Sequence, residues 1–187
     1  MINDAALALR DGFLAAFPKE TVINEEFAKE DTDFRTIATK IKARNPDAVY
    51  HLLFAPQGSI FVKSLRQLGY TGAIFAVHNV EDPSEIAASN GTYEGLWFVT
   101  GDDMEGREYF DAFKKRFKRY PAMGGPNAFD YGKMIIEAAA AGDALLPRLK
   151  TLKNFQGAFG RYDATDGNSF DLKATVKVIK GSGFMLP

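Results

Sequence analysis

Three short apolar runs, each rich in residues that favour β-strands, recur along this sequence with helical patterns between them. The runs cover residues 48–54, 73–77 and 95–100. Between the first two, Pro56 opens a helix that Gly69 ends. Short, continuously apolar strands are typical of parallel sheets that are buried on both faces. Strands that alternate with helices at this spacing predict an α/β fold with a doubly wound, mostly parallel sheet.

Two helices and a strand are expected before the first of these runs. Apolar residues between Ala5 and Phe17 have helical spacing. Thr21-Val22-Ile23 has the composition of a short strand. Asp31-Thr32-Asp33-Phe34 then supplies N-cap candidates for a second helix, which Asn45-Pro46 closes.

The pattern changes beyond the third apolar run. Two amphipathic helices are predicted, from Tyr109 to Arg119 and from Asn127 to Ala141, with no strand between them. Antiparallel strands are predicted at residues 157–159 and 174–179, around a turn at residues 163–168. We therefore expect extra helices and a C-terminal antiparallel hairpin beside the parallel sheet.

Charge and composition exclude several classes of partner and chemistry. The 187 residues carry 23 basic and 24 acidic side chains, a net charge of -1, so nucleic-acid binding is not expected. The absence of cysteine excludes thiol catalysis and thiolate metal sites, and two histidines are left for imidazole chemistry. The chain starts without a secretory signal, and no apolar stretch approaches the ~20 residues that span a bilayer, so direct membrane insertion is not expected.

Motifs for catalysis, metal binding and cofactor binding are also missing. No nucleophile, acid pair or metal cluster recurs at a meaningful spacing, so we expect no catalytic residues, no metal and no cofactor. Asp163, Asp166 and Asn168 lack the ligand spacing of an EF-hand and indicate a turn. Residues 181–183 precede no helix that could hold a phosphate, and we expect a flexible end there.

An ordered series of motifs gives the chain a resemblance to one family. The series is Asp31-Thr32-Asp33-Phe34, Ile41-Lys42-Ala43-Arg44-Asn45-Pro46-Asp47-Ala48-Val49, Leu65-Arg66-Gln67-Leu68-Gly69-Tyr70-Thr71-Gly72, Tyr93-Glu94-Gly95-Leu96, Tyr120-Pro121, Phe129-Asp130-Tyr131, Gly157-Ala158-Phe159-Gly160 and Asp163-Ala164-Thr165-Asp166-Gly167. It resembles the C-terminal part of type I periplasmic solute-binding proteins, such as branched-chain amino-acid receptors. The resemblance implies non-catalytic binding of a small-molecule ligand in the periplasm or outside the cell. It also implies a role in an ABC transporter, with a membrane permease as partner, or in a related sensor domain.

The same resemblance implies a division of the chain between two lobes that close on the ligand. Residues 1–100 would form the α/β core of the second lobe, residues 101–155 would contribute helices to the first lobe, and residues 156–187 would return to the second lobe. Family members carry the first lobe and one strand ahead of the helix expected at Ala5. We therefore expect a truncated gene or a fragment.

Self-association is expected for the same reason. The missing strand would leave backbone groups unpaired inside the sheet. Helices that lack their lobe would expose five apolar side chains, namely Phe110, Phe113, Phe117, Met134 and Ile135. Such a patch predicts a homodimer, or a complex with a separate chain that supplies the missing lobe.

The ligand site is expected where the first two buried strands end. Open parallel sheets bind ligands beyond the carboxyl ends of their strands, which selects Phe54, Ala55, Pro56 and Gln57 after one strand and His78-Asn79-Val80 after the next. By resemblance, Phe54 falls where family members place an aromatic ring against the ligand. His78 falls where amino-acid receptors place a carboxylate for the ligand ammonium, and the missing carboxylate argues against specificity for amino acids. The resemblance as a whole implies a ligand that is amino acid-like or an aromatic acid.

Structural interpretations of these and other residues stay open. Phe54 is also compatible with strand-end core, and His78 with a hydrogen-bonded loop histidine. His51 is expected to be structural, and Trp97 to be core or interface. Two other functions stay open: a small flavodoxin-like enzyme or regulator, and a truncated fragment that acts only in association. The basic residues between Lys114 and Arg119 are expected to form a solvated helix face.

Overall fold

A computed structural model describes residues 4–17, 23–28, 31–102, 106–122, 124–142, 144–166 and 169–187. These residues form two compact units, one of residues 1–98 and 177–187 and one of residues 99–176. The assignment of residues 1–100, 101–155 and 156–187 to family lobes stays a prediction. The strand predicted at Thr21-Val22-Ile23 lies outside the described residues, apart from Ile23, which is in neither helix nor strand.

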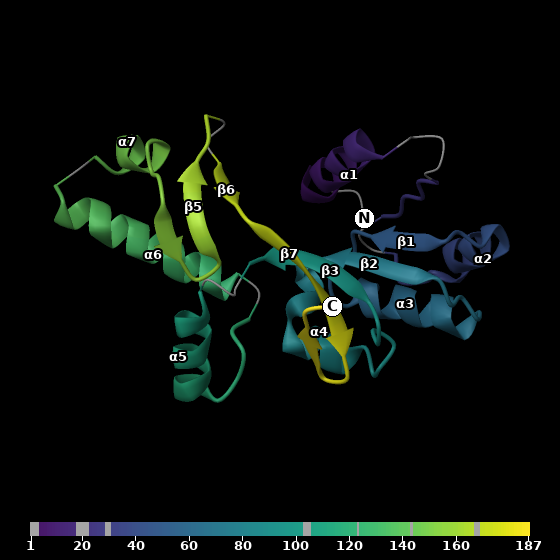
Figure 1. The fold of residues 1–187 in the computed structure, drawn as a ribbon. Coiled ribbons are helices and arrows are strands. Elements are labelled where there is room, and N and C mark those ends of the chain that lie inside the picture. Colours follow the sequence, from purple (N-terminus) through teal and green to yellow (C-terminus); the bar gives the residue numbers. More distant parts are fainter. Residues whose placement is uncertain are drawn as a thin grey trace. The chain divides into compact units, whose positions relative to one another are not determined.

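Helices and strands alternate through the first half of the chain, and antiparallel strands dominate its end (Figure 1). The elements are α1 Asp4–Ala16, α2 Arg35–Arg44, β1 Ala48–His51, α3 Gln57–Gln67, β2 Ala73–Val77, the 3-10 helix η2 His78–Glu81, α4 Pro83–Ala88, β3 Trp97–Gly101, α5 Arg107–Phe117, α6 Gly125–Ala140, α7 Leu145–Lys150, β4 Phe155–Gly157, β5 Gly160–Ala164, β6 Phe170–Leu172, β7 Ala174–Lys180 and β8 Gly183–Met185. The predicted α/β fold with a parallel-rich sheet is confirmed.

The larger sheet has five strands in the order β1-β2-β3-β7-β8. β1 and β2 run parallel, with Ala48 opposite Ala73 and His51 opposite Ala76. β7 and β8 run antiparallel, with Lys180 opposite Gly183. The register of β1 and β2 places their carboxyl ends at one edge of the sheet, where the chain continues into α3 and η2.

The prediction that these strands are buried on both faces is wrong. Val49 and His51 of β1 are buried, whereas Ala48 is exposed and Tyr50 is half-buried. In β2, Phe75 keeps 36% of its surface exposed. The reason is that α3 and α4 cover one face of the sheet, while α1 lies on the other face and meets only part of it through the Phe13 and Tyr50 rings, 5.0 Å apart (Figure 1).

The core of this unit lies between the sheet and the helices α2, α3 and α4. Its fully or nearly buried apolar members are Phe34, Ala38, Val49, Leu53, Phe61, Val62, Leu65, Tyr70, Ile74, Ala76, Val80, Ile86, Tyr93, Leu96, Phe98 and Ile179. Burial of each large apolar side chain stabilises the fold by about 1.5–3 kcal/mol. This core fixes the strand ends that carry the predicted ligand loops.

Both ends of α2 are set by the residues next to it. Asn45 takes a left-handed conformation, with φ 43°, and its N–H donates to the carbonyl oxygens of Ile41 and Lys42, as predicted for the helix end. At the other end the N-cap is Phe34, whose side chain makes no capping hydrogen bond. The N-cap thus lies within the predicted segment, and the neighbouring Asp33 carboxylate accepts from the backbone N–H of Arg35 at 3.1 Å and pairs with its guanidinium at 2.6 Å.

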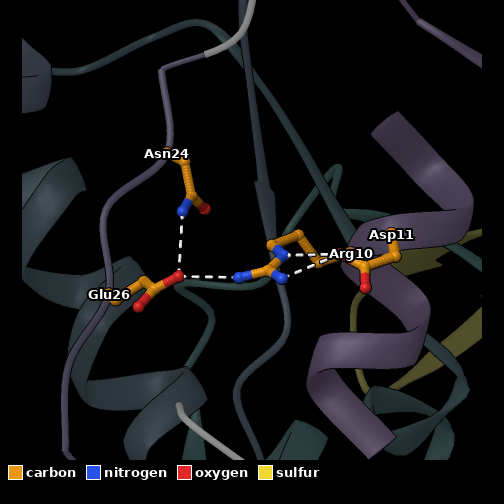
Figure 2. Close-up of polar contacts among 4 residues, drawn as sticks. All are labelled: Arg10, Asp11, Asn24 and Glu26. Carbon is orange, nitrogen blue, oxygen red and sulfur yellow. Dashed lines mark hydrogen bonds and ion pairs between the residues drawn. The ribbon is translucent and has the colours of Figure 1, made fainter. Parts of the chain in front are cut away.

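Polar contacts join α1 to the segment of residues 23–28 (Figure 2). Arg10 donates to Glu26 at 2.7 Å and pairs with Asp11 at 2.8 Å. Asn24 donates to the same Glu26 oxygen at 3.1 Å. These partners raise the pKa of Arg10, mainly through the hydrogen bond to Asp11. Exposed ion pairs contribute little free energy, so this contact adds little to the stability of the fold.

The second unit packs α5 and α6 against a three-stranded antiparallel sheet of order β4-β5-β6. Phe110 and Met134, which were expected to lack a packing partner, are 9% and 2% exposed, so that expectation is wrong for them. They pack with Phe155, Phe159 and Tyr162 of the hairpin. Two other members of the predicted patch, Phe117 and Ile135, keep 49% and 48% of their surface exposed.

Asp130 of α6 fixes the hairpin between β4 and β5. Its carboxylate is fully buried and accepts from the N–H of Ala158 at 2.7 and 2.9 Å and from the hydroxyl of Tyr162 at 2.8 Å. A Cβ on Gly157 would come within 2.6 Å of the Asp130 Oδ2 atom. Burial and the hydrogen bond to Asp130 raise the pKa of Tyr162. The glycine therefore allows the close approach that this buried hydrogen-bond set requires.

The C-terminal strands pair differently from the prediction. Residues 158–159 form the turn between β4 and β5, while β7 joins the five-stranded sheet, so the predicted pairing of residues 157–159 with 174–179 is wrong. The expected flexible end at residues 181–183 is also wrong, because β7 and β8 form a hairpin there. Gly181 has a φ of +58°, which suits a tight hairpin turn. No helix among the described residues is long and apolar enough to cross a membrane.

Candidate functional site

Two loops meet at the carboxyl edge of β1 and β2. β1 ends at His51 and β2 ends at Val77, and parallel pairing brings the following residues to the same edge. The side-chain amide of Asn79 donates to the carbonyl oxygen of Leu53 and so joins the two loops directly. The structure thus brings together the two segments that the sequence selected.

The six predicted site residues differ in exposure. Phe54 and Gln57 are half-buried, and Ala55 and Pro56 are exposed. These four precede or begin α3, whose first turn is supported by the Ser59 hydroxyl donating to the carbonyl oxygen of Pro56 at 2.9 Å. The loop thus offers both apolar and polar surface beside the start of a helix.

The loop after β2 carries one exposed and one buried side chain. His78 is exposed, whereas Asn79 is 6% exposed. Among the described residues, the Asn79 Oδ1 atom is buried without a hydrogen-bond partner. Its Nδ2 atom must face Leu53, because a carbonyl oxygen can only accept, so the amide orientation is fixed. A buried acceptor without a partner costs about 1–3 kcal/mol, and a donor on a ligand would remove that cost.

His51 lies beneath this edge. It is 4% exposed, and its Nδ1 atom accepts from the Leu53 N–H at 3.4 Å. Its Nε2 atom has no hydrogen-bond partner among the described residues. Burial lowers the pKa of His51 to about 4, so the imidazole is neutral near pH 7. The prediction of a buried structural histidine agrees with this position.

A buried tyrosine and glutamate lie against the first turn of α3. The Tyr93 hydroxyl donates to Glu85 at 2.7 Å, and burial together with this hydrogen bond raises the pKa of Tyr93. A Cβ on Gly58 would lie 2.6 Å from the Tyr93 hydroxyl and 3.6 Å from the His51 Cε1 atom. Gly58 therefore lets α3 start close to the buried side chains of Tyr93 and His51. Sequence patterns did not reveal this cluster, although Tyr93 belongs to the motif Tyr93-Glu94-Gly95-Leu96.

A second carboxylate after β2 is paired as well. Glu81 closes η2 and accepts from Lys177 of β7 at 2.7 Å, with both residues buried. Lys177 Nζ also lies 4.6 Å from the ring centre of Phe184. Sequence patterns did not reveal this pair either, because its members lie 96 residues apart.

Three kinds of side chain meet at this edge of the sheet. A half-buried aromatic ring offers an apolar contact, and an exposed imidazole and a buried amide can form hydrogen bonds. Within the described ranges, no three histidine or acidic side chains gather in a way that could hold a metal ion.

Solved structures of solute-binding proteins share this fold. The leucine-binding protein LivK of Thermotoga maritima matches with a TM-score of 0.87 and 23% identity, over 99% of this chain and 57% of that protein. LivJ of Streptococcus pneumoniae, solved with isoleucine, matches with a TM-score of 0.85 and 19% identity, over 97% and 55%. A solute-binding protein of R. palustris, solved with benzoate, matches with a TM-score of 0.71 and 17% identity, over 85% and 47%.

The chain covers only part of the length of these relatives. It spans 57% of the Thermotoga protein, so it corresponds to little more than half of a relative of this kind. A comparison with curated protein sequences found no match. The sequence model of the periplasmic binding protein family matches residues 4–179, nearly the whole chain. This chain therefore belongs to the periplasmic binding protein family.

Proposed function

We propose that this chain binds a small solute without chemical change, as part of an ABC-transporter substrate-binding protein or a related sensor domain. The observation that carries the proposal is the Asn79 to Leu53 hydrogen bond, which brings the two strand-end loops together. The site would comprise Phe54, Ala55, Pro56, Gln57, His78 and Asn79. Family membership supports the same function.

The side chains at this edge favour an aromatic acid over an amino acid within that proposal. The two buried carboxylates after β2 already accept hydrogen bonds, Glu81 from Lys177 and Glu85 from Tyr93. An ammonium group would therefore share either carboxylate with a donor that is already bound, because a carboxylate can accept several hydrogen bonds. Phe54 offers an aromatic contact and His78 a nitrogen donor, which together suit a ring that carries a carboxylate.

A calorimetric and thermal-shift panel tests this function. The probes are leucine, isoleucine, benzoate and, for a flavodoxin-like alternative, flavin mononucleotide. A solute that binds the native state at 100 times its Kd stabilises the fold by about 2.7 kcal/mol. We expect stabilisation by benzoate or an amino acid and none by the nucleotide, with the solute recovered unchanged. Stabilisation by the nucleotide alone, or turnover of a solute, would contradict the proposal.

Location and transport partner follow from the proposed function. A solute-binding protein of an ABC transporter works in the periplasm or outside the cell and hands its ligand to a membrane permease. We propose this location and this partner for the protein that contains the chain. A sensor domain would bind the same solute but would not stimulate transport by a reconstituted permease.

We also propose that the chain associates with a second copy or with a separate chain that supplies a further lobe. Large apolar side chains of α6 and α7 support this, since Phe129, Ile136 and Leu146 are 51%, 69% and 62% exposed. Sedimentation at micromolar concentration should give a dimer, and Ile136→Lys should shift it toward monomer. A wild-type chain that sediments as a compact monomer would rule out the homodimer.

A further inference from the structure

A buried ion pair links the loop after β2 to a strand far along the chain. Glu81 at the end of η2 is 8% exposed, and Lys177 of β7 is 3% exposed. The Lys177 Nζ atom lies 2.7 Å from the Glu81 Oε1 atom. Separating these groups would cost the attraction between two buried opposite charges, which is unfavourable. The pair therefore joins η2 to β7 within this unit.

The lysine end of the pair is fixed from a second direction. The Lys177 Nζ atom lies 4.6 Å from the ring centre of Phe184 in β8. Phe184 meets Phe98 of β3 edge-on, with ring centres 5.7 Å apart. A cation held over an aromatic face out of water is stabilised more than an exposed one. The ammonium is thus placed by β8 as well as by its own strand.

The glutamate end belongs to the short helix that carries two predicted site residues. η2 has four residues, His78 to Glu81, and a helix this short contributes few hydrogen bonds of its own. Its position depends on anchors: Asn79 donates to Leu53, Val80 is fully buried in the core, and Glu81 binds Lys177. The contacts of Asn79 and Val80 lie near the sheet edge. The contact of Glu81 joins η2 to Lys177 of β7, 96 residues later in the chain.

We propose that Glu81 and Lys177 are positioning residues, whose ion pair holds η2 so that His78 and Asn79 can bind solute. The part of this proposal that concerns solute rests on the function proposed above. The boundary between the two units falls within β7, between Val176 and Lys177, and Lys177 belongs to the same unit as η2.

Hydrogen exchange tests the positioning role without any solute. The double variant Glu81→Gln with Lys177→Met removes both charges of this pair together, a change that is often neutral for stability, so the fold should persist. We expect amides of η2 to exchange about tenfold faster or more, while amides of β2 keep their wild-type rates. Equal exchange in η2 of a folded double variant would overturn the proposal, and so would a uniform increase in both elements.

Affinity for the solute is the second measurement, with a matched control on the same strand. Lys180 pairs with Glu94 at 3.4 Å, but both side chains are more than half exposed, so Lys180→Met removes a charge from β7 without breaking a buried pair. With leucine, isoleucine or benzoate, we expect about tenfold weaker binding by the double variant and unchanged binding by Lys180→Met. Equal affinity of wild type and double variant would overturn the proposal.

These two measurements separate the positioning role from the proposed function. If the wild-type chain binds none of the three solutes, the proposed function fails, but the exchange rates of η2 still decide whether the ion pair positions the loop. If solute binds and exchange is unchanged in the double variant, the function stands and the positioning role is wrong.

Discussion

Two buried polar sites, one in each unit, differ in how their hydrogen-bonding capacity is used. In the second unit, the fully buried carboxylate of Asp130 accepts from a backbone N–H and a tyrosine hydroxyl. At the β1 and β2 edge of the first unit, the Asn79 Oδ1 and His51 Nε2 atoms are buried without hydrogen-bond partners among the described residues. One arrangement is complete within the chain, and the other leaves bonding capacity unused.

We interpret the Asp130 site as structural and the Asn79 amide as part of the binding site proposed above. Buried polar groups in folded proteins are nearly always hydrogen-bonded, and each exception calls for an explanation, such as a bound water or ion or a functional role. Asp130 therefore needs nothing from outside the chain. Asn79 and His51 lie beside the loops that we propose for solute binding, where a ligand could supply a donor to the amide oxygen.

The strongest effect on folding is expected at Asp130. Asp130→Ala leaves the Ala158 N–H and the Tyr162 hydroxyl buried with this acceptor removed, so the free energy of unfolding should fall by roughly 3–5 kcal/mol. Tyr162→Phe removes one of the donors and should cost about 1–2 kcal/mol. Urea unfolding measures both values. A loss below about 1 kcal/mol for Asp130→Ala would show that the hydrogen-bond set is not what fixes the hairpin.

A pH-dependent effect is expected from His51. Its pKa is lowered by burial to about 4 in the fold, against about 6.5 in an unfolded chain. The unfolded chain therefore binds more protons between these values. The resulting stability is fully present above pH ~6.5 and is lost as the pH falls toward 4, by up to about 3 kcal/mol.

The variant His51→Gln isolates this contribution. Unfolding free energies of wild type and variant should be measured by urea titration at pH 7 and pH 4.5. Wild type should lose more stability than the variant over this range, because the variant has no imidazole to protonate at this position. An identical pH dependence in the two proteins would contradict the buried, neutral imidazole.

Asn79→Ala is expected to separate stability from binding. Loss of the bond to the Leu53 carbonyl should lower the free energy of unfolding by about 1–2 kcal/mol. Solute affinity should fall by more than that, since the variant loses both the loop connection and the unpartnered acceptor. Urea unfolding and calorimetry supply the two numbers. Full affinity in a destabilised variant would make Asn79 structural and leave the site to its neighbours.

Phe54→Ala and His78→Ala are expected to change binding more than folding. Phe54 is half-buried and His78 is exposed, so each substitution should cost little unfolding free energy. Each should weaken solute binding by about tenfold, or ~1.4 kcal/mol. If calorimetry finds normal binding in both variants, the site assignment is wrong.

Local patterns in the sequence predicted the elements around the proposed site. β2 occupies residues 73–77 as predicted, and Gly69 follows α3 with a φ of +76°. These features depend on neighbours in the sequence, such as an apolar run or a glycine after a helix. The position of the two loops at one edge followed from parallel pairing alone.

Features that depend on distant residues could not be predicted in this way. Asp130 is fixed by Ala158 and Tyr162, about thirty residues later, and the order of residues does not reveal that contact. Lys177 lies in a strand pattern between two valines, so nothing local distinguishes it from an exposed lysine. Residues 181–183 suggested a flexible end because the short β8 that pairs with β7 was not recognised.

Amide chemical-shift mapping by NMR tests the central claim, a solute site at the carboxyl edge of β1 and β2. The best-binding solute of the panel is added to isotope-labelled protein. We expect the largest shift changes on residues 54–57 and 78–81, with the side-chain amide of Asn79 among them. Changes confined to residues 99–176, with none in these loops, would contradict it.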